Sequence, residues 1–373
     1  MTKPKRLKIV GNFSSVLIIR LNDIGEVVMT LPCLDAVRHA LPGARIGFLV
    51  SPPSHELLLH DSRVDQIFVF EKKLWRDRPS LQGIKQLGKL LLDLHRERFD
   101  LAIDLHNNPS THWLAYVSGA RYRVSLDSKY RSRYLMTWKA APCAGWEQMH
   151  NIERHFHVLT SVGIPTRGAE YRFALDPESR MRVKTQLDQE LEPGKPVVVL
   201  QPGAGLPERC WPVQRFGELA ARLVEEAGAQ IVVHCGPGED HLGERIRQSV
   251  PQPVLIAKRL TLQELAGLLD LCDLLISNDS GPMHLAAALG KPVVAVFGPT
   301  HPQRSGPYQA RSVAVSNYVE CSPCGIQNLS CIHRKCLTDI SADEVYDAAV
   351  RVLSRERDRP QEESSGIASA GAS

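Results

Sequence analysis

The fold is decided by residues 273–299, which read DLLISNDSGPMHLAAALGKPVVAVFGP. Residues 274–276 and 293–297 are short apolar runs, the second rich in β-branched side chains, and both are predicted to be buried strands. Between them the sequence favours a helix with one apolar side, because Pro282 suits a first turn and Gly290 suits a helix end. A strand, loop, helix and strand in this order predict a parallel α/β sheet.

The loop of this unit, residues 278–281, lies after a strand and before a helix. In doubly wound sheets this is where ligands bind, because free backbone amides and the helix dipole both favour an anion. A phosphate on residues 280–283 and a sugar or ribose hydroxyl on Asp279 would fit such a loop. The alternative is that Asp279 or Ser280 only caps the helix.

The whole chain has the composition of a globular protein. Of its 373 residues, 43% are hydrophobic and 23% are charged. This length is sufficient for two domains. No run approaches the roughly 20 apolar residues of a membrane span. The apolar run at residues 16–21 is short and β-branched, so it is predicted to be a first strand rather than a signal peptide, and the protein is expected to be cytoplasmic.

The first half of the chain opens with a similar unit. After the strand at 16–21, an apolar stripe over residues 27–40 predicts a helix and residues 45–50 predict a second strand. The turn between them lacks the Gly-x-Gly-x-x-Gly pattern, which argues against a dinucleotide-dependent dehydrogenase. Glu26 or Asp23 in this turn would suit a general base facing a cleft. The alternative is an acid placed favourably in a first helical turn, worth about 0.3–1 kcal/mol.

The second half repeats the unit at residues 197–227 and 230–249. Each predicted strand ends in a glycine-containing loop, one around Gly203 and one around Gly238 and Glu239, and Arg209 in the first loop could neutralise a diphosphate. Because the carboxyl ends of parallel strands meet at one edge of a sheet, these loops and the Asp279 loop are expected to converge on one site.

A basic and aromatic stretch occupies residues 121–134. Its cations are Arg121, Arg123, Lys129, Arg131 and Arg133, and they alternate with tyrosines, although the net charge of the chain is only +4. Such a stretch could meet an anionic lipid head group, a phosphorylated sugar or a nucleic acid. It could also be a solvated loop.

Nine cysteines in a chain expected to be cytoplasmic argue against a disulfide framework. Four of them, Cys321, Cys324, Cys331 and Cys336, follow the last predicted strand. Thiolates at this spacing could hold a structural zinc or iron ion and secure a long loop. A redox-active Cys-x-x-Cys pair or free packed thiols are the alternatives.

The predicted domain organisation follows a change in composition at residues 165–196, which are polar and rich in Pro and Gly. We expect a first lobe at 1–170 and a second at 171–340, an amphipathic helix at 341–357 and a disordered tail at 358–373. In the second lobe, Thr261 and Glu264 predict a capping box at the start of a helix.

Several motifs together resemble glycosyltransferase family 9, the ADP-heptose:lipopolysaccharide heptosyltransferases. The similarity runs from about residue 16 to 353, and the 277–300 segment is its most specific part. The motifs are VLIIRLNDIGEVVMTLP (16–32), FDLAIDLHNN (99–108), SGARYRVSL (118–126), LQPGAG (200–205), RCWPVQRF (209–216), SNDSGPMHLAAALGKPVVAVFGPT (277–300) and CSPC (321–324).

The resemblance implies a GT-B architecture, in which two Rossmann-like lobes face each other across a cleft. It implies that the first lobe binds a lipid-linked oligosaccharide acceptor and the second an ADP-sugar donor, ADP-heptose or a relative. It also implies catalysis without a cofactor, work at the inner membrane surface, no nucleic acid partner, and a final helix that crosses back onto the first lobe.

The resemblance assigns roles to particular residues. Asp279 is similar to the family's nucleotide-sugar carboxylate, and Arg209 to its phosphate-facing cation, with Glu239 similar to a ribose-binding carboxylate. The remaining donor residues implied are Ser280, Gly281, Pro282 and Gly203, and the acceptor residues are Arg121, Arg123, Lys129 and Arg131. The family's catalytic Asp follows a Gly in the first turn; here that position is Glu26, and Asp23 is the alternative base.

The predicted function is therefore inverting transfer of a heptose or related sugar from an ADP-sugar to a lipopolysaccharide core or similar glycan. Two alternatives remain at this stage. A nucleotide-sugar-binding protein without transfer activity would follow if the change from Asp to Glu at position 26 removed catalysis. A GT-B epimerase or hydrolase would keep the fold and change the chemistry.

Overall fold

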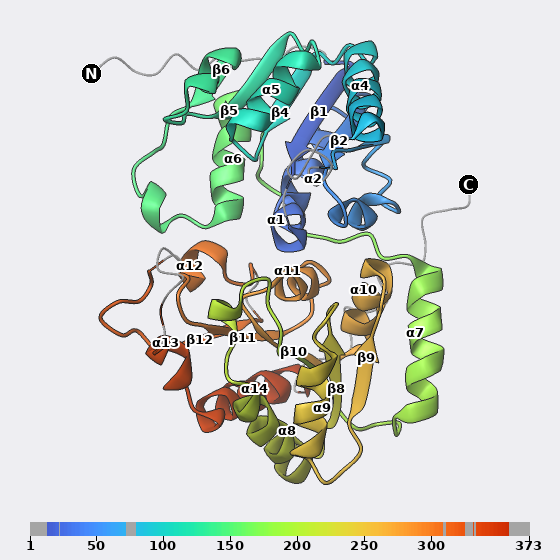
Figure 1. Cartoon of the computed structure of the whole chain (residues 1–373), viewed down its shortest axis with the longest axis vertical. Coiled ribbons are helices and arrows are strands. Elements are labelled where there is room, and N and C mark those ends of the chain that lie inside the picture. The colour runs from blue at the N-terminus through green and yellow to red at the C-terminus, as the bar shows by residue number, and fades with distance from the viewer. Residues whose placement is uncertain are drawn as a thin grey trace.

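The computed structural model describes residues 13–21, 23–71, 80–308, 311–324, 331 and 333–357. The chain forms two α/β lobes, stacked one above the other in Figure 1. The predicted tail and part of the cysteine loop lie outside the described residues.

Each lobe is built on a six-stranded sheet, and the two sheets have the same strand order. The orders are β3-β2-β1-β4-β5-β6 and, read in the equivalent direction, β9-β8-β7-β10-β11-β12. Every pairing is parallel, so both sheets follow the doubly wound 3-2-1-4-5-6 pattern that binds ligands at the carboxyl ends of its strands. The predicted α/β fold with two Rossmann-like lobes is confirmed.

The strands of the first lobe are β1 Ser15–Arg20, β2 Arg45–Val50, β3 Gln66–Val69, β4 Leu101–Asp104, β5 Tyr122–Leu126 and β6 Trp138–Ala140. Those of the second are β7 Val197–Gln201, β8 Gln230–Cys235, β9 Leu255–Lys258, β10 Leu274–Asn278, β11 Val293–Phe297 and β12 Val313–Ser316. The central strands β1, β10 and β11 are buried along their whole length, as expected for parallel strands covered on both faces. The strands missed from sequence, β6, β9 and β12, are short and only half-buried.

The helices of the first lobe are α1 Ile24–Val28, α2 Leu31–Ala40, η1 Ser54–Leu58, α4 Leu81–Arg96, α5 Pro109–Val117, η2 Arg131–Leu135, η3 Trp146–Gln148 and α6 Asn151–Ser161. The single helix predicted over residues 27–40 is thus wrong, because the chain breaks at Met29 and Thr30. Pro32 in the first turn of α2 has no amide hydrogen to continue the preceding helix, and the Thr30 hydroxyl donates to the carbonyl of Val27.

The helices of the second lobe are α7 Pro177–Glu190, η4 Pro207–Arg209, α8 Val213–Ala227, α9 Asp240–Gln248, α10 Leu262–Leu271, α11 Gly281–Ala288, α12 Pro302–Ser305, α13 Lys335–Thr338 and α14 Ala342–Arg357. The predicted capping box of Thr261 and Glu264 is present at α10. Helix α14 packs on α8 and on strands β10, β11 and β12. The expected crossing of this helix back onto the first lobe is therefore wrong, because its apolar side chains, Val345 and Val352 among them, enter the core of the second lobe.

Helix α11 departs from the one-sided helix predicted for it. Its residues from Met283 to Ala288 are all buried, because α10 and strands β10 and β11 pack on it from its own lobe while α1 packs on it from the first lobe. Helix α1 of the first lobe and helix α11 of the second lobe are therefore in direct contact.

In the part of the chain that is described, no helix has both the length and the apolar character that a membrane crossing requires.

Candidate active site

The three glycine-containing loops of the second lobe converge, as predicted. Asn278 connects two of them, since its side-chain amide donates to the carbonyl of Pro202 (2.7 Å) and its side-chain oxygen accepts from the backbone amide of Trp211 (2.9 Å). The third is joined by Glu239, whose carboxylate accepts from the amide of Gly236 (2.9 Å). A Cβ atom on Gly203 would lie about 2 Å from that carboxylate, so the Gly203 loop can approach it only because glycine has no side chain.

Asp279 lies at the centre of this convergence. It is 3% exposed, its carboxylate accepts from the Thr300 hydroxyl (2.7 Å), and it pairs with Arg209 (3.3 Å). Burial raises the pKa of Asp279, while the charge of Arg209 and the hydrogen bond from Thr300 oppose that shift. A buried carboxylate next to a partly exposed guanidinium can present both an acceptor and a positive charge to a bound ligand.

The amino end of α11 begins next to Asp279. Its cap residue is Ser280, whose hydroxyl lies 2.9 Å from that of Ser277. The Ser280 side chain accepts no hydrogen bond from the first amides of the helix. The interpretation in which Asp279 or Ser280 caps the helix is therefore wrong. These amides, together with the helix dipole, suit an anion.

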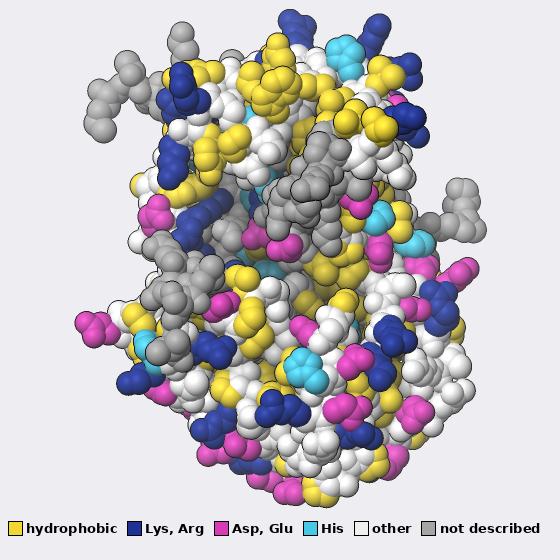
Figure 2. Space-filling view, in the orientation of Figure 1, with side chains coloured by type: hydrophobic (Ala, Val, Ile, Leu, Met, Phe, Trp, Pro, Cys, Tyr) yellow, Lys and Arg dark blue, Asp and Glu magenta, His cyan; other side chains and the backbone are white. Residues whose placement is uncertain are grey.

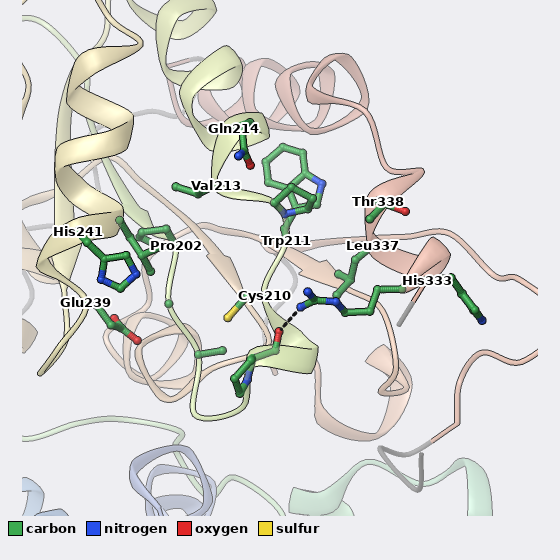
Figure 3. A pocket seen from close by; sticks show the side chains of 16 residues that line it. Pro202, Cys210, Trp211, Val213, Gln214, Glu239, His241, His333, Leu337 and Thr338 are labelled. Atoms are coloured by element: carbon green, nitrogen blue, oxygen red, sulfur yellow. Dashed lines mark hydrogen bonds between the residues drawn. The ribbon is translucent and has the colours of Figure 1, made fainter. Parts of the chain in front are cut away.

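A cavity of about 490 Å³ adjoins these loops. Figure 3 shows Glu239 and His241 on its α9 side and His333, Leu337 and Thr338 on its α13 side, with Cys210 between. Arg334 donates to the carbonyl of Pro207 (2.9 Å) across one end. A space of this size, with apolar walls and a carboxylate at one end, has the character of a small-molecule site.

Glu26 lies on the opposite side, in the first lobe. Its carboxylate forms an ion pair with Arg20, the last residue of β1, and the Glu26 side chain is 33% exposed. Arg20 is buried and also donates to the carbonyl of Leu105 and to His155. Burial lowers the pKa of Arg20 to about 10, with the Asp104 charge opposing the shift, so the guanidinium remains charged near neutral pH.

Asp23, the alternative base, is exposed at the start of α1. Its carbonyl accepts from the amides of Glu26 and Val27, and among the described residues its carboxylate caps no amide of α1. The buried Arg20 thus contacts Glu26, whereas Asp23 faces solvent.

The two halves of the site meet where α1 packs on α11. A Cβ atom on Gly25 would lie 2.7 Å from His284 Cδ2, and one on Gly281 would lie 3.0 Å from the Cβ of Ile24. Two glycines therefore allow the turn that carries Glu26 to contact the first turn of α11. In this arrangement Glu26 follows directly after Gly25, the residue that contacts α11.

The chain matches a known protein family along much of its length. The model of glycosyltransferase family 9 (heptosyltransferase) matches residues 87–332, more than half of the chain. The chain belongs to glycosyltransferase family 9. This glycosyltransferase is 26% identical over 285 residues to lipopolysaccharide heptosyltransferase 3 of Escherichia coli, covering 74% of this chain and 81% of that protein.

Solved structures agree on the fold. The glycosyltransferase family 9 protein from Veillonella parvula superposes with a TM-score of 0.81 at 25% identity, over 92% of this chain and 98% of that one. The E. coli heptosyltransferase WaaC solved with ADP gives a TM-score of 0.73 at 20% identity, over 91% and 99% of the two chains. The predicted GT-B architecture and the predicted glycosyltransferase class of enzyme are confirmed.

Further residues join the two lobes of the glycosyltransferase, and the sequence analysis assigned them no role in the site. The Tyr308 hydroxyl donates to Glu153 of α6, and the Tyr308 ring lies 4.8 Å from that of His150. His150 in turn donates to the carbonyl of Gly306 (3.0 Å). These partners are about 155 residues apart in the chain, so only the packing of the lobes reveals them.

The basic stretch of the first lobe divides into two groups. Arg123 is used internally, since its guanidinium donates to the carbonyls of Leu135 (2.7 Å) and Ala120 (2.6 Å). Arg121, Lys129 and Arg131 are exposed. The predicted acceptor role thus fits these three cations better than Arg123.

The four clustered cysteines differ in exposure, from exposed Cys321 to buried Cys336. Burial raises the pKa of Cys336, and the charges of Cys321, Cys324 and Cys331 raise it further. Within the described residues, no three His, Cys, Asp or Glu side chains are grouped as metal ligands. The donor set suits zinc or iron, while the described side chains do not form a coordination sphere.

Proposed function

We propose that this glycosyltransferase transfers a sugar, a heptose or a close relative, from an ADP-sugar to a lipopolysaccharide core or similar lipid-linked glycan, with inversion at the anomeric carbon. The observation that carries the proposal is the packing of α1 on α11, which brings the turn that carries Glu26 against the uncapped first turn of α11. The relatives named for heptose transfer to lipopolysaccharide support the sugar and the acceptor class.

The donor would bind in the second lobe. The nucleoside would occupy the cavity of about 490 Å³ beside Glu239, whose carboxylate would accept from a ribose hydroxyl. The diphosphate would lie on the amino end of α11, facing Arg209, while Asp279 would accept from a hydroxyl of the donor. WaaC, which shares this fold, was solved with ADP, and this supports adenine as the base.

The chemistry would be a single displacement. Glu26 takes the proton of an acceptor hydroxyl as its oxygen attacks the anomeric carbon from the face opposite the diphosphate. The new C–O bond forms as the bond from the anomeric carbon to the phosphate oxygen breaks, through an oxocarbenium-like transition state. ADP leaves with the electron pair, and Arg209 and the α11 amides stabilise its growing charge.

Arg20 would orient the base. Glutamate has one more methylene than the family's aspartate, and the ion pair with Arg20 folds the Glu26 side chain back toward the end of β1. Such positioning matters because a displacement of about 1 Å can cost about a hundredfold in rate.

The acceptor would approach from the first lobe. The exposed cations Arg121, Lys129 and Arg131 suit phosphates or acidic sugars of the acceptor. With a water-soluble nucleotide donor and a lipid-linked acceptor, the proposed reaction would take place at the cytoplasmic surface of the inner membrane.

The four cysteines would hold a structural zinc or iron ion, outside the chemistry of transfer. The spacing of these four thiols within residues 321–336 supports this assignment. Metal analysis of purified protein would test it: stoichiometric metal that is lost together with thermal stability in Cys324→Ser is the expected result.

Two measurements test the function. A thermal-shift panel of ADP-, UDP-, GDP- and CMP-sugars should show preferential stabilisation by the ADP-sugar, and a preference for UDP would refute the proposed donor. Mass spectrometry should then show one added sugar on the acceptor. Release of free sugar alone, or an epimerised donor, would instead favour the hydrolase or epimerase alternative.

A further inference from the structure

An exposed apolar surface covers one face of the first lobe. Large hydrophobic side chains that remain exposed gather there on two helices and the turn η2: Leu81 (81% exposed), Ile84 (50%), Leu92 (46%), Trp113 (60%), Tyr116 (50%), Tyr130 (41%) and Tyr134 (76%). We call this set, with the cations between its members, the α4–α5 face. Large apolar side chains that are exposed together are typical of a docking surface.

Helix α4 shows the arrangement most clearly. Leu81, Ile84 and Leu92 follow helical spacing and lie along one outward stripe. Cations alternate with them on the same stripe, at the exposed positions Lys85, Lys89 and Arg96. The opposite side of the helix buries Gly83 and Leu94 against the sheet.

Helix α5 and η2 extend this stripe into a continuous surface. The α4–α5 contact includes His95, which lies 3.2 Å from the carbonyl of Val117, and η2 packs on α5. Trp113 and Tyr116 form an edge-to-face pair on α5 with ring centroids 6.2 Å apart. Figure 2 shows yellow hydrophobic side chains over α4 and α5 with dark blue Lys and Arg side chains around them.

The acidic residues of α4 and of its C-terminal cap lie off the outward stripe. Asp93 is half-buried, and Glu97 pairs with Arg45. Arg121 and Arg131 add exposed positive charge at the η2 end. The face is therefore both apolar and positively charged, and a surface of aromatic and aliphatic side chains among cations is complementary to an anionic lipid bilayer.

We propose that the α4–α5 face docks the enzyme onto an anionic phospholipid bilayer, with Leu81, Ile84 and Trp113 at the acyl boundary and Lys85 and Lys89 at the phosphates. The inference rests on the proposed function in that a lipid-linked acceptor gives the docking its purpose. Its geometry agrees, because α5 starts directly after the loop that contains Leu105, whose carbonyl binds the same Arg20 that pairs with Glu26. When α5 is docked on the bilayer, the loop at its amino end connects it through Arg20 to the proposed base, Glu26.

Vesicle sedimentation tests the docking directly. The full-length protein should sediment with vesicles of phosphatidylcholine mixed with phosphatidylglycerol, and much less with phosphatidylcholine alone. Binding should weaken as salt rises, because the phosphate contacts are screened. Equal binding to both vesicle types, or to neither, would overturn the proposal.

Paired variants locate the surface. Leu81→Asp with Trp113→Asp should weaken binding to the anionic vesicles at least tenfold, because it places charges at the apolar boundary. The matched control replaces exposed apolar residues of the second lobe, Met181→Asp with Tyr318→Asp, 59% and 56% exposed, and should change binding less than about twofold. Equal loss in both pairs would count against the assigned face.

Two lysine variants test the electrostatic contribution to vesicle binding. Lys85→Gln and Lys89→Gln should each weaken binding about fivefold, the factor expected for one cation near an anionic surface. Arg245→Gln and Lys258→Gln, at exposed positions of the second lobe, serve as controls and should leave binding unchanged. If neither Lys85→Gln nor Lys89→Gln weakened binding to the anionic vesicles, the role of the cations would be refuted, and with it the bilayer as partner.

Two further readouts separate the outcomes. Sedimentation velocity should show the same oligomeric state for the parent and for the Leu81 and Trp113 variant; dissociation of a dimer by that variant would assign the face to a second copy of the chain and refute the bilayer. Transfer to a delipidated, water-soluble acceptor should be unaffected by the variant, while transfer to acceptor in vesicles should fall. Failure of all transfer, with vesicle binding still dependent on the α4–α5 face, would contradict the proposed function and leave the docking surface supported.

Discussion

The two lobes share one strand order, and each ends its fourth strand with a buried carboxylate. Asp104 ends β4 in the first lobe, and Asp279 follows β10 in the second. Burial raises the pKa of both. The partners differ: Asp104 accepts from the amides of His106 and Asn107 in its own loop (both 3.0 Å), whereas Asp279 binds Arg209 and Thr300 from two other loops.

This difference shows how corresponding strand ends in one topology come to make different contacts. Asp104 is fully buried and organises the loop that follows it, including the carbonyl that holds Arg20. Asp279 lies where three loops meet and contacts a cation that is still partly exposed. The same strand end therefore supports loop structure in the first lobe, whereas in the second lobe it lies where we propose that the donor binds.

The largest effect on activity is expected at Glu26, the proposed base of the first lobe. Glu26→Gln removes the proton acceptor and should lower kcat by about 10²- to 10⁴-fold, while the affinity for the ADP-sugar, measured by calorimetry, changes less than about twofold. Asp23→Asn, three residues away in the same turn, is the matched control and should keep most of the activity. A fall of kcat in Asp23→Asn with normal turnover in Glu26→Gln would exchange their roles.

The fourth-strand carboxylate of the first lobe should affect stability through pH. The folded-state pKa of Asp104 is about 6, above the usual 3.8, so its contribution to stability is present below about pH 4 and is lost as pH rises to about 6, amounting to about 3 kcal/mol. Asp104→Asn should remove this part of the pH dependence in urea unfolding between pH 4 and 7. Parallel curves for the two proteins would show that Asp104 titrates as it does in the unfolded chain.

The equivalent change in the second lobe should act on the donor. Asp279→Asn removes a charged hydrogen-bond acceptor and should lower kcat/KM for the ADP-sugar about 10- to 100-fold, with little loss of thermal stability because the Asn oxygen can still accept from Thr300 and the partly exposed Arg209 can be solvated. Asp104→Asn should leave the donor KM unchanged. If both variants shifted the donor KM equally, the contrast between the two carboxylates would fail.

A smaller effect is expected at the loop contact of the donor lobe. Gly203→Ala places a methyl group about 2 Å from the present position of the Glu239 carboxylate, so Glu239 must move and donor affinity should fall about tenfold if it holds the ribose. Gly205→Ala, two residues on, meets no described atom within 4 Å and is the control. Similar donor affinities for the two variants would argue against Glu239 as a donor ligand.

The smallest effect should come from the exposed cations of the acceptor lobe. Arg131→Gln should raise the acceptor KM about two- to fivefold at low salt and less at high salt, since an exposed charge contributes about 0.2–1 kcal/mol. The donor KM should not change. Steady-state kinetics at two ionic strengths would measure this, and a salt-independent effect would indicate that Arg131 acts through structure.

Much of the local structure was predictable because it depends on short-range patterns. The predicted strands at 45–50 and 293–297 coincide with β2 and β11, since apolar runs are set by adjacent residues. The convergence of the Gly203, Glu239 and Asp279 loops was also predictable, because parallel strands place their carboxyl ends at one edge. The break at Met29 and Thr30 was missed, since the apolar stripe continues through it.

The sequence by itself determined the two α/β lobes, the strand-end loops and the residue types that suit a diphosphate and a base, because these follow from periodicity and from the chemistry of single side chains. Only the tertiary structure decided that α14 stays on the second lobe, that Arg20 pairs with Glu26, and that Gly25 contacts His284. The lobe contacts join residues more than 100 positions apart, as Tyr308 and Glu153 do. Their geometry depends on how two finished cores pack against each other, which no local pattern records.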